Sequence, residues 1–152
     1  MSSSQSETSV TLAIYEGFAQ GRLDHWDNFF DPDVVINSPA GRDTVGREAL
    51  KAWVQAFLSS FQPRVDLIDH YVAGDRGLVT INMHWKHDGQ PFFGIAPTGV
   101  SGTSVETFIL RLKDGLVTHF DVADNSLDLA IYLHEQRMAL PRSVTPPALI
   151  SG

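Results

Sequence analysis

The spacing of apolar residues in this sequence changes from a helical period to a strand period near Pro63. Before Pro63, apolar residues recur at the spacing of amphipathic helices in three segments, at residues 10–20, 23–30 and 47–61. After Pro63, four segments alternate in polarity or are rich in β-branched residues, as strands are; they cover residues 64–73, 77–87, 102–112 and 115–124. Turn sequences such as "GDRG" and "KDG" separate these predicted strands.

Three shorter segments complete the expected order of elements. "DVVINS", residues 33–38, predicts a strand; "PAGRDTVG", residues 39–46, predicts a turn; and "SLDLAIYLHEQ", residues 126–136, predicts a closing helix. Helices followed by an antiparallel sheet predict an α+β fold in which the helices cover one face of the sheet. A strongly bent sheet around a long helix forms a cone, and its open mouth is a natural site for an apolar ligand.

The composition indicates one acidic domain without cysteine. The chain has 152 residues, is 43% hydrophobic and carries a formal net charge of -7, which suits a single core and argues against a nucleic-acid partner. It lacks both an apolar run of about 18 residues and a signal peptide, so we expect a cytoplasmic protein without membrane contact. We expect residues 1–8 to be a disordered tail, 9–138 the domain, and 139–152 a proline-rich tail.

Several motifs along the folded part occur in a characteristic order: "INSPAG", "GREALKAWVQAF", "AGDRGLVTI", "FFGIAPTG" and "LRLKDGLVTHFDVADNSLDLAIYLHEQ". Together they resemble the SnoaL-like polyketide cyclase family of the nuclear transport factor two-like superfamily. The resemblance implies a cone-shaped α+β barrel, with a curved antiparallel sheet wrapped around the N-terminal helices. It also implies an enzyme without a cofactor that closes rings in small, apolar, carbonyl-bearing polyketides by an intramolecular aldol step, with relatives that hydroxylate or isomerise. Acid/base catalysis and a pocket that holds the substrate in a reactive shape would carry that reaction.

The catalytic carboxylate that the resemblance implies is Asp121, directly after the aromatic Phe120 near the end of the last strand. Strand alternation places His119 on the face of Asp121, where it could orient the carboxylate, and places Asp124 on the opposite face. Only one of the two aspartates can therefore face the pocket from a regular strand. We take Asp121 and His119 as catalytic candidates and keep Asp124 as a candidate for substrate binding.

The remaining candidates lie at the expected mouth and walls of the cone. His87 continues the face formed by Val79, Ile81, Met83 and Trp85, so it is a further catalytic candidate. Candidates for substrate binding have polar groups on apolar faces or lie in the loop at residues 92–102; they are Tyr15, Asn37, Trp53, Trp85 and Phe93. Each also has an ordinary structural interpretation, as a core aromatic, a turn-capping amide or a hairpin residue.

No metal site is expected, because the six histidines do not have the spacing of a ligand set, and no cofactor is expected. Two rival functions remain open: an epoxide hydrolase or epoxide-opening cyclase, which would need Arg111 beside Asp121 and a second Asp, and a non-catalytic binding or dimerisation domain. A homodimer is expected on fold analogy. Its contact would be the apolar face of Phe108, Leu110, Phe120 and Val122, unless that face is the packed one and Asp121 faces outward.

Overall fold

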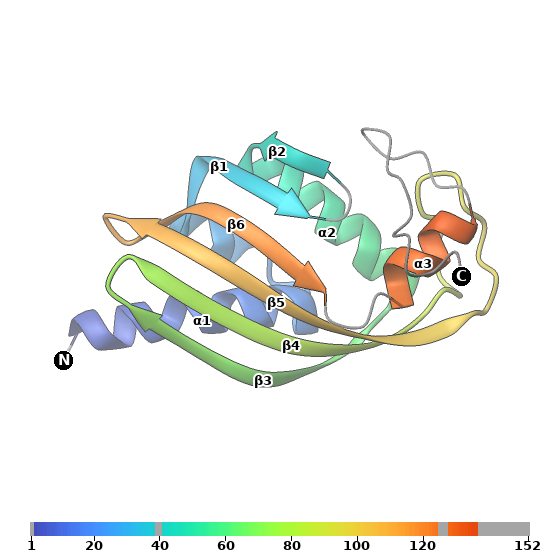
Figure 1. Ribbon diagram of the computed structural model, residues 1–152, viewed down its shortest axis with the longest axis horizontal. Helices are drawn as coiled ribbons and strands as arrows, with labels where there is room; N and C mark the ends of the chain where they lie inside the picture. The colour runs from blue at the N-terminus through green and yellow to red at the C-terminus, as the bar shows by residue number, and fades with distance from the viewer. Residues whose placement is uncertain (1, 39–40, 125–127, 137–152) are drawn as a thin grey trace, which may run out of the picture.

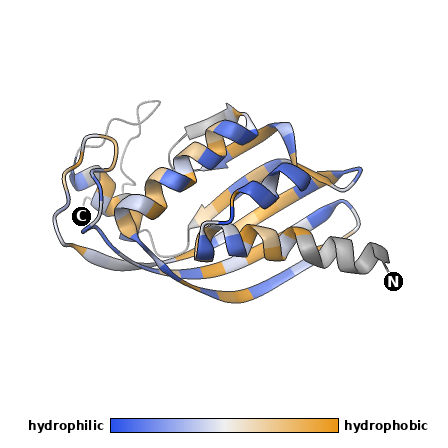
Figure 2. Ribbon diagram, turned by 180° about the vertical axis from the view of Figure 1, so that it is seen from behind, coloured by the Kyte–Doolittle hydropathy of each residue, from blue (hydrophilic) through white to orange (hydrophobic). Residues whose placement is uncertain are grey.

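The protein is described from a computed structural model, which covers residues 2–38, 41–124 and 128–136. Its centre is a six-stranded sheet with the strand order β2-β1-β6-β5-β4-β3, so β2 and β3 form open edges and the sheet does not close on itself. The sheet is strongly curved, and the helices lie on one side of it (Figures 1 and 2). This arrangement confirms the predicted α+β fold, in which helices cover one face of a curved sheet.

The helical elements are α1 (Ser2–Gln20), η1 (Asp24–Asn28, a 3-10 helix), α2 (Arg47–Phe61) and α3 (Asp128–Glu135). The helices expected at residues 47–61 and 126–136 are confirmed as α2 and α3. Residues 2–8, expected to be a disordered tail, instead continue α1, because no proline or glycine interrupts them and a helix that has already formed extends at little cost. The expected tail at residues 139–152 lies outside the described residues.

The strands are β1 (Phe30–Ser38), β2 (Gly41–Val45), β3 (Arg64–Ala73), β4 (Arg76–Lys86), β5 (Ser101–Lys113) and β6 (Leu116–Asp124). The four predicted long strands are confirmed as β3 to β6, each antiparallel to the next. The sheet is mixed rather than purely antiparallel, because β1 runs parallel to β6. The predicted turn at residues 39–46 is partly wrong: Thr44 and Val45 pair with β1, since β-branched residues suit an edge strand.

Ion pairs connect η1 to the first turns of α2. Lys51 donates from Nζ to Asp27 Oδ1 at 2.8 Å, and Arg47 Nε lies 3.3 Å from the same oxygen. The hydrogen bond from Lys51 lowers the pKa of Asp27 below its usual range. The contribution of this pair to stability is therefore present at neutral pH and is lost as the pH falls through the lowered pKa. Because Asp27 is exposed, solvent keeps that contribution small.

The core contains two groups of aromatic rings in contact. The first aromatic cluster joins α1, η1, β1, β5 and β6, with ring centroids between 4.9 and 5.8 Å apart; its members are Phe18, Trp26, Phe30, Phe108 and Phe120. The second aromatic cluster joins α2, β4, α3 and the loop after β4; its members are Trp53, Phe57, Phe61, Trp85, His87, Phe92, Phe93 and Tyr132. Both clusters lie on the helix-covered side of the sheet, which we call the interior face.

The apolar residues of β5 and β6 belong to this interior face. Phe108, Leu110 and Phe120 are at most 2% exposed, and Phe108 stacks on Phe18 of α1 at 4.9 Å. The prediction that this surface forms a subunit contact is therefore wrong, and the alternative that it is the packed face is confirmed. The hydrophobic effect explains why this face of β5 and β6 is the buried one, since it is the more apolar of the two faces and the helices cover it.

The opposite, outer face of the sheet carries no helix among the described residues, as Figure 1 shows. Polar side chains such as Thr80 and Thr107 pair across the strands there, at 3.0 Å. Large apolar side chains nevertheless remain exposed on it, among them Tyr71 at 52% and Ile109 at 46%. In the described part of the chain, no helix is both long enough and apolar enough to span a membrane.

Candidate functional site

The interior face contains a single buried carboxylate among the described residues, that of Glu106. This side chain is 5% exposed and projects from the middle of β5, where Glu106 pairs with the fully buried Ile81 of β4. Carboxylates are almost never fully buried unless they are paired, because the loss of hydration is expensive, so a buried one is a rare feature. Glu106 is therefore the first residue to consider for acid/base chemistry inside the fold.

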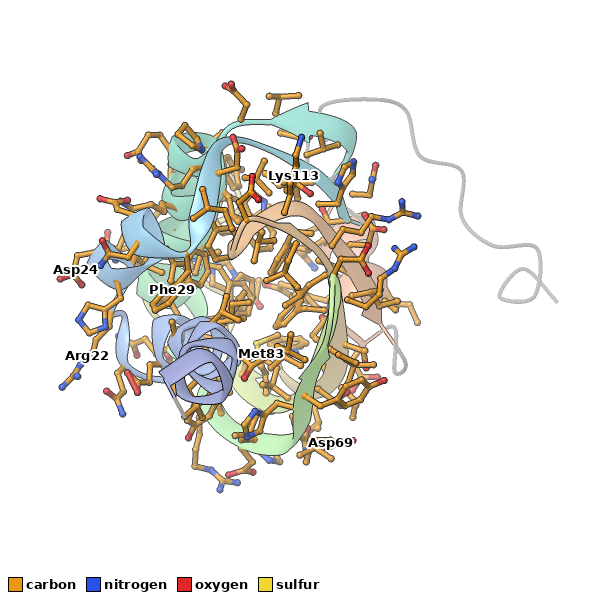
Figure 3. The ribbon with its side chains drawn as sticks, turned by 90° about the vertical axis from the view of Figure 1, so that its left-hand side faces the viewer. Arg22, Asp24, Phe29, Asp69, Met83 and Lys113 are labelled. Carbon is orange, nitrogen blue, oxygen red and sulfur yellow. The ribbon has the colours of Figure 1, made fainter. Side chains whose placement is uncertain are left out.

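Glu106 lies between the two aromatic clusters. Ser104, two residues before it, accepts a hydrogen bond from the Trp85 indole at 3.1 Å, so it contacts the second aromatic cluster. Phe108, two residues after it, belongs to the first. Alternate residues of a strand share a face, so the carboxylate projects inward between two aromatic surfaces. Figure 3 looks along the fold and shows Met83, the β4 neighbour of Ser104, inside the curved sheet, with Asp24 and Asp69 at the periphery.

Asp121 and His119, the predicted catalytic pair, lie on the outer face instead. Asp121 pairs across the sheet with the exposed Ile109, and His119 pairs with Arg111. The expectation that they face the interior is wrong, because Phe120 between them is buried in the first aromatic cluster and alternation turns its neighbours outward. The catalytic role expected of them depended on that orientation.

Asn37 meets Asp121 on this outer face. The two residues pair in register between β1 and β6, and Asn37 Nδ2 donates to Asp121 Oδ1 at 3.0 Å. Asn37 was expected to bind a substrate carbonyl, but its amide is directed to this carboxylate. Arg111 is also exposed on the outer face, so the Arg and Asp required for epoxide opening do not meet in the interior.

His87 faces the interior, as predicted, and is completely buried. Its Nε2 lies 3.1 Å from the Gln90 carbonyl, which can only accept, so Nε2 carries the hydrogen. Its Nδ1 then accepts from the Tyr132 hydroxyl at 2.7 Å, and that hydroxyl also lies 2.7 Å from Thr98 Oγ1. The imidazole stacks on Phe61 at 4.6 Å. His87 thus joins the loop after β4 to α3, and its acid/base role stays a prediction.

The loop that begins "FFGI" forms a tight reversal in which its two aromatics point in different directions. Phe92 and Ile95 exchange backbone hydrogen bonds at 2.9 and 3.0 Å around Phe93 and Gly94, both of which have positive φ. Phe92 is fully buried against the second aromatic cluster, whereas Phe93 is 51% exposed. Phe93 was expected at the substrate; in the structure, Phe92 is the residue that faces inward.

The other predicted binding residues are distributed along the interior. Trp85 is buried with its indole N–H on Ser104, Tyr15 of α1 is partly buried against the core, and Trp53 is partly buried on α2. Asp124 ends β6, but its side chain lies outside the described residues. Within the described ranges, no group of three or more His, Asp or Glu residues could hold a metal ion.

Sequence reasoning missed Glu106 and Tyr132. The sequence does carry a signal for Glu106, because Ser104, Glu106, Phe108 and Leu110 alternate on one face of β5. Assigning that face to the outside removed Glu106 from consideration. Tyr132 lies in the predicted closing helix, and nothing in its local pattern indicates a bond to a residue 45 positions earlier.

Replacing Tyr132 by Phe tests whether this hydrogen-bond network holds the loop and α3 in place. The change removes one hydroxyl and leaves His87 Nδ1 buried without its donor, so we expect a loss of about 1–3 kcal/mol in the free energy of unfolding. Tyr71→Phe on the outer face is the matched control and should cost almost nothing. Urea denaturation measures both; equal stabilities for the two variants would contradict a structural role for the network.

Comparison with known proteins identifies the family. The family model described as SnoaL-like domain matches residues 12–120, which include Trp53, His87 and Glu106. No curated protein matches the sequence.

Solved structures share the fold at low sequence identity. A candidate SnoaL-like polyketide cyclase from Jannaschia sp. CCS1 is 20% identical with a TM-score of 0.71, over 86% of this chain and 91% of that one. IdmH, a candidate polyketide cyclase from Streptomyces antibioticus, is 22% identical with a TM-score of 0.66, over 84% and 98%. A protein with a ketosteroid isomerase-like fold from Catenulispora acidiphila is 14% identical with a TM-score of 0.62, over 89% and 97%. The likeness to these structures shows the nuclear transport factor two-like fold. The family model, which matches more than half of the sequence, establishes that the chain belongs to the SnoaL-like domain family.

Proposed function

We propose that this protein is a cofactor-independent SnoaL-like cyclase. It would act by acid/base catalysis on a small, largely apolar, carbonyl-bearing metabolite of polyketide type, closing a ring by an intramolecular aldol step. The observation that carries the proposal is the burial of the Glu106 carboxylate on the interior face, on the strand whose residues Ser104 and Phe108 contact the two aromatic clusters. The family match and the names of the structural neighbours, two of which are candidate polyketide cyclases, support the same class of reaction.

In the proposed mechanism, Glu106 acts first as a base and then as an acid. Its carboxylate removes a proton from carbon next to a substrate carbonyl, and the electron pair of the broken C–H bond forms an enolate. The enolate carbon attacks a second carbonyl of the same molecule, which forms the C–C bond of the ring. The resulting alkoxide takes the proton back from Glu106, so the enzyme returns to its starting state.

The aromatic walls would supply the other part of catalysis. A flexible polyketide has many conformations, and only a few place the two reacting carbons within contact distance. Flat surfaces on both sides of Glu106 would hold the chain folded, which lowers the entropic part of the barrier. They would also keep water from the enolate, because the surrounding side chains are apolar and buried.

Glu106→Gln tests the base directly. Anthrone is a suitable probe, since it is a flat tricyclic ketone whose methylene protons, opposite the carbonyl, are acidic. We expect the protein to accelerate exchange of these protons with deuterium from the solvent, and Glu106→Gln to lower the catalysed rate by about 10²–10⁴-fold. NMR of anthrone in D₂O follows the exchange.

Asp121→Asn is the matched control, because it removes a carboxylate from the outer face. Its exchange rate should stay close to that of the parent protein. Loss of exchange in Asp121→Asn with full activity in Glu106→Gln would overturn the assignment. Anthrone binding without any catalysed exchange would favour a non-catalytic binding domain instead.

We also propose that the protein forms a homodimer through the outer face. Tyr71 and Ile109 are exposed there, and no described helix covers them. Large apolar side chains on an uncovered sheet are typical of subunit contacts. Sedimentation should show a dimer that Ile109→Lys dissociates; a monomeric parent protein would contradict this proposal.

A further inference from the structure

The three tryptophans of the chain differ in how their indole N–H groups are satisfied. Trp26 donates to the Ala13 carbonyl at 2.8 Å, and Trp85 donates to Ser104 Oγ at 3.1 Å. The Nε1 atom of Trp53 is also buried, yet it has no acceptor among the described residues. Trp53 is thus the tryptophan whose indole N–H finds no acceptor within the described part of the chain.

An unused buried donor has an energetic cost. A buried N–H without an acceptor loses its hydrogen bond to water and gains none in return. Most buried polar groups in folded proteins are therefore paired, and an exception requires a specific explanation. A ligand that brings its own acceptor would recover this energy on binding.

The position of Trp53 suits a ligand contact. Unlike Trp26 and Trp85, which are at most 3% exposed, Trp53 is only partly buried, so its ring is not sealed in the core. Its orientation is nevertheless fixed. The indole lies parallel to Phe57, with an interplanar angle of 4° and a centroid separation of 5.7 Å, and Phe92 meets it edge-on at 5.8 Å.

The surroundings of Trp53 limit the chemistry of its partner. Phe57 and Phe92 are buried aromatics, and neither provides a charge or a polar group that could bind a cation or share an anion. A flat apolar molecule with one oxygen acceptor directed at α2 fits such surroundings, since aromatic faces favour stacked and edge-on contacts. The orientation of the donor is set before binding, so little side-chain entropy would be lost.

We infer that the Trp53 indole N–H is the hydrogen-bond donor that anchors a carbonyl-type oxygen of the ligand. This inference deepens the proposed function and rests on it for the class of ligand, a flat, oxygenated, polyketide-like molecule. It adds a specificity-determining contact on α2, separate from Glu106 on β5. Trp53 thereby selects ligands that carry an acceptor over hydrocarbons of the same shape.

The test compares anthrone with dihydroanthracene, which has the same tricyclic skeleton but a methylene group in place of the carbonyl. One hydrogen bond should make the affinity for anthrone about tenfold higher than that for dihydroanthracene. Trp53→Phe should abolish this preference. Trp85→Phe is the matched control, because its N–H is already bonded to Ser104; it should keep the preference. Fluorescence titration measures the six affinities, two ligands for each of the three proteins, and the ratio of the two ligands cancels any general loss of packing.

A spectroscopic readout separates a hydrogen bond from a packing effect. In ¹⁵N-labelled protein, the indole N–H signals are assigned from the two Trp→Phe variants. We expect the Trp53 indole N–H signal to move downfield when anthrone binds. With dihydroanthracene, its chemical shift should change much less. An unchanged Trp53 signal, or a preference for anthrone that survives Trp53→Phe, would overturn the inference.

The outcome is independent of catalysis. If anthrone binds through Trp53 but the protein does not exchange its methylene protons, the proposed cyclase function fails while the anchor stands. If exchange is catalysed and depends on Glu106 but not on Trp53, the function stands and the anchor fails.

Discussion

The packing of Phe120 against Phe30 and Phe108 determines the orientation of the two strands on which the candidate site depends. Once Phe120 is buried, strand alternation turns Asp121 and His119 to the outer face. The register between β5 and β6 pairs Phe120 with Leu110, so Leu110 also faces the interior. Glu106 lies on the same face of β5 as Leu110, so its side chain faces the interior too. A single hydrophobic contact thus decides which carboxylate can reach a ligand in the interior.

Most of the fold could be predicted from sequence, because period and turn residues are local signals. They located α2 and the strands β3 to β6. They missed β2, whose pairing with β1 depends on a neighbouring strand rather than on its own pattern, and they began α1 too late. For the site, alternation correctly grouped Asp121 with His119. It could not show which group faces inward, since that depends on where the helices pack. The face that carries Phe108 and Phe120 is the more apolar one, and this difference in the sequence indicates that it is the buried face.

Hydrogen bonds and ring contacts at one end of the sheet set the positions of the aromatic side chains in the interior. The His87, Tyr132 and Thr98 network fixes the loop after β4, and that loop presses Phe92 against the second aromatic cluster. Phe92 in turn makes an edge-on contact with Trp53, whose indole N–H has no acceptor among the described residues. In this account, hydrogen bonds at one end of the sheet position the apolar surfaces that fold the substrate, while Glu106 performs the proton transfers.

The most direct test of this account is a crystal structure of the protein with anthrone bound. We expect anthrone on the interior face, between the two aromatic clusters, with its edge in contact with the Glu106 carboxylate. Anthrone bound on the outer face beside Asp121 and Asn37 would contradict the central claim. Binding in the interior without contact to Glu106 would also contradict it, because the base could not then reach a substrate proton.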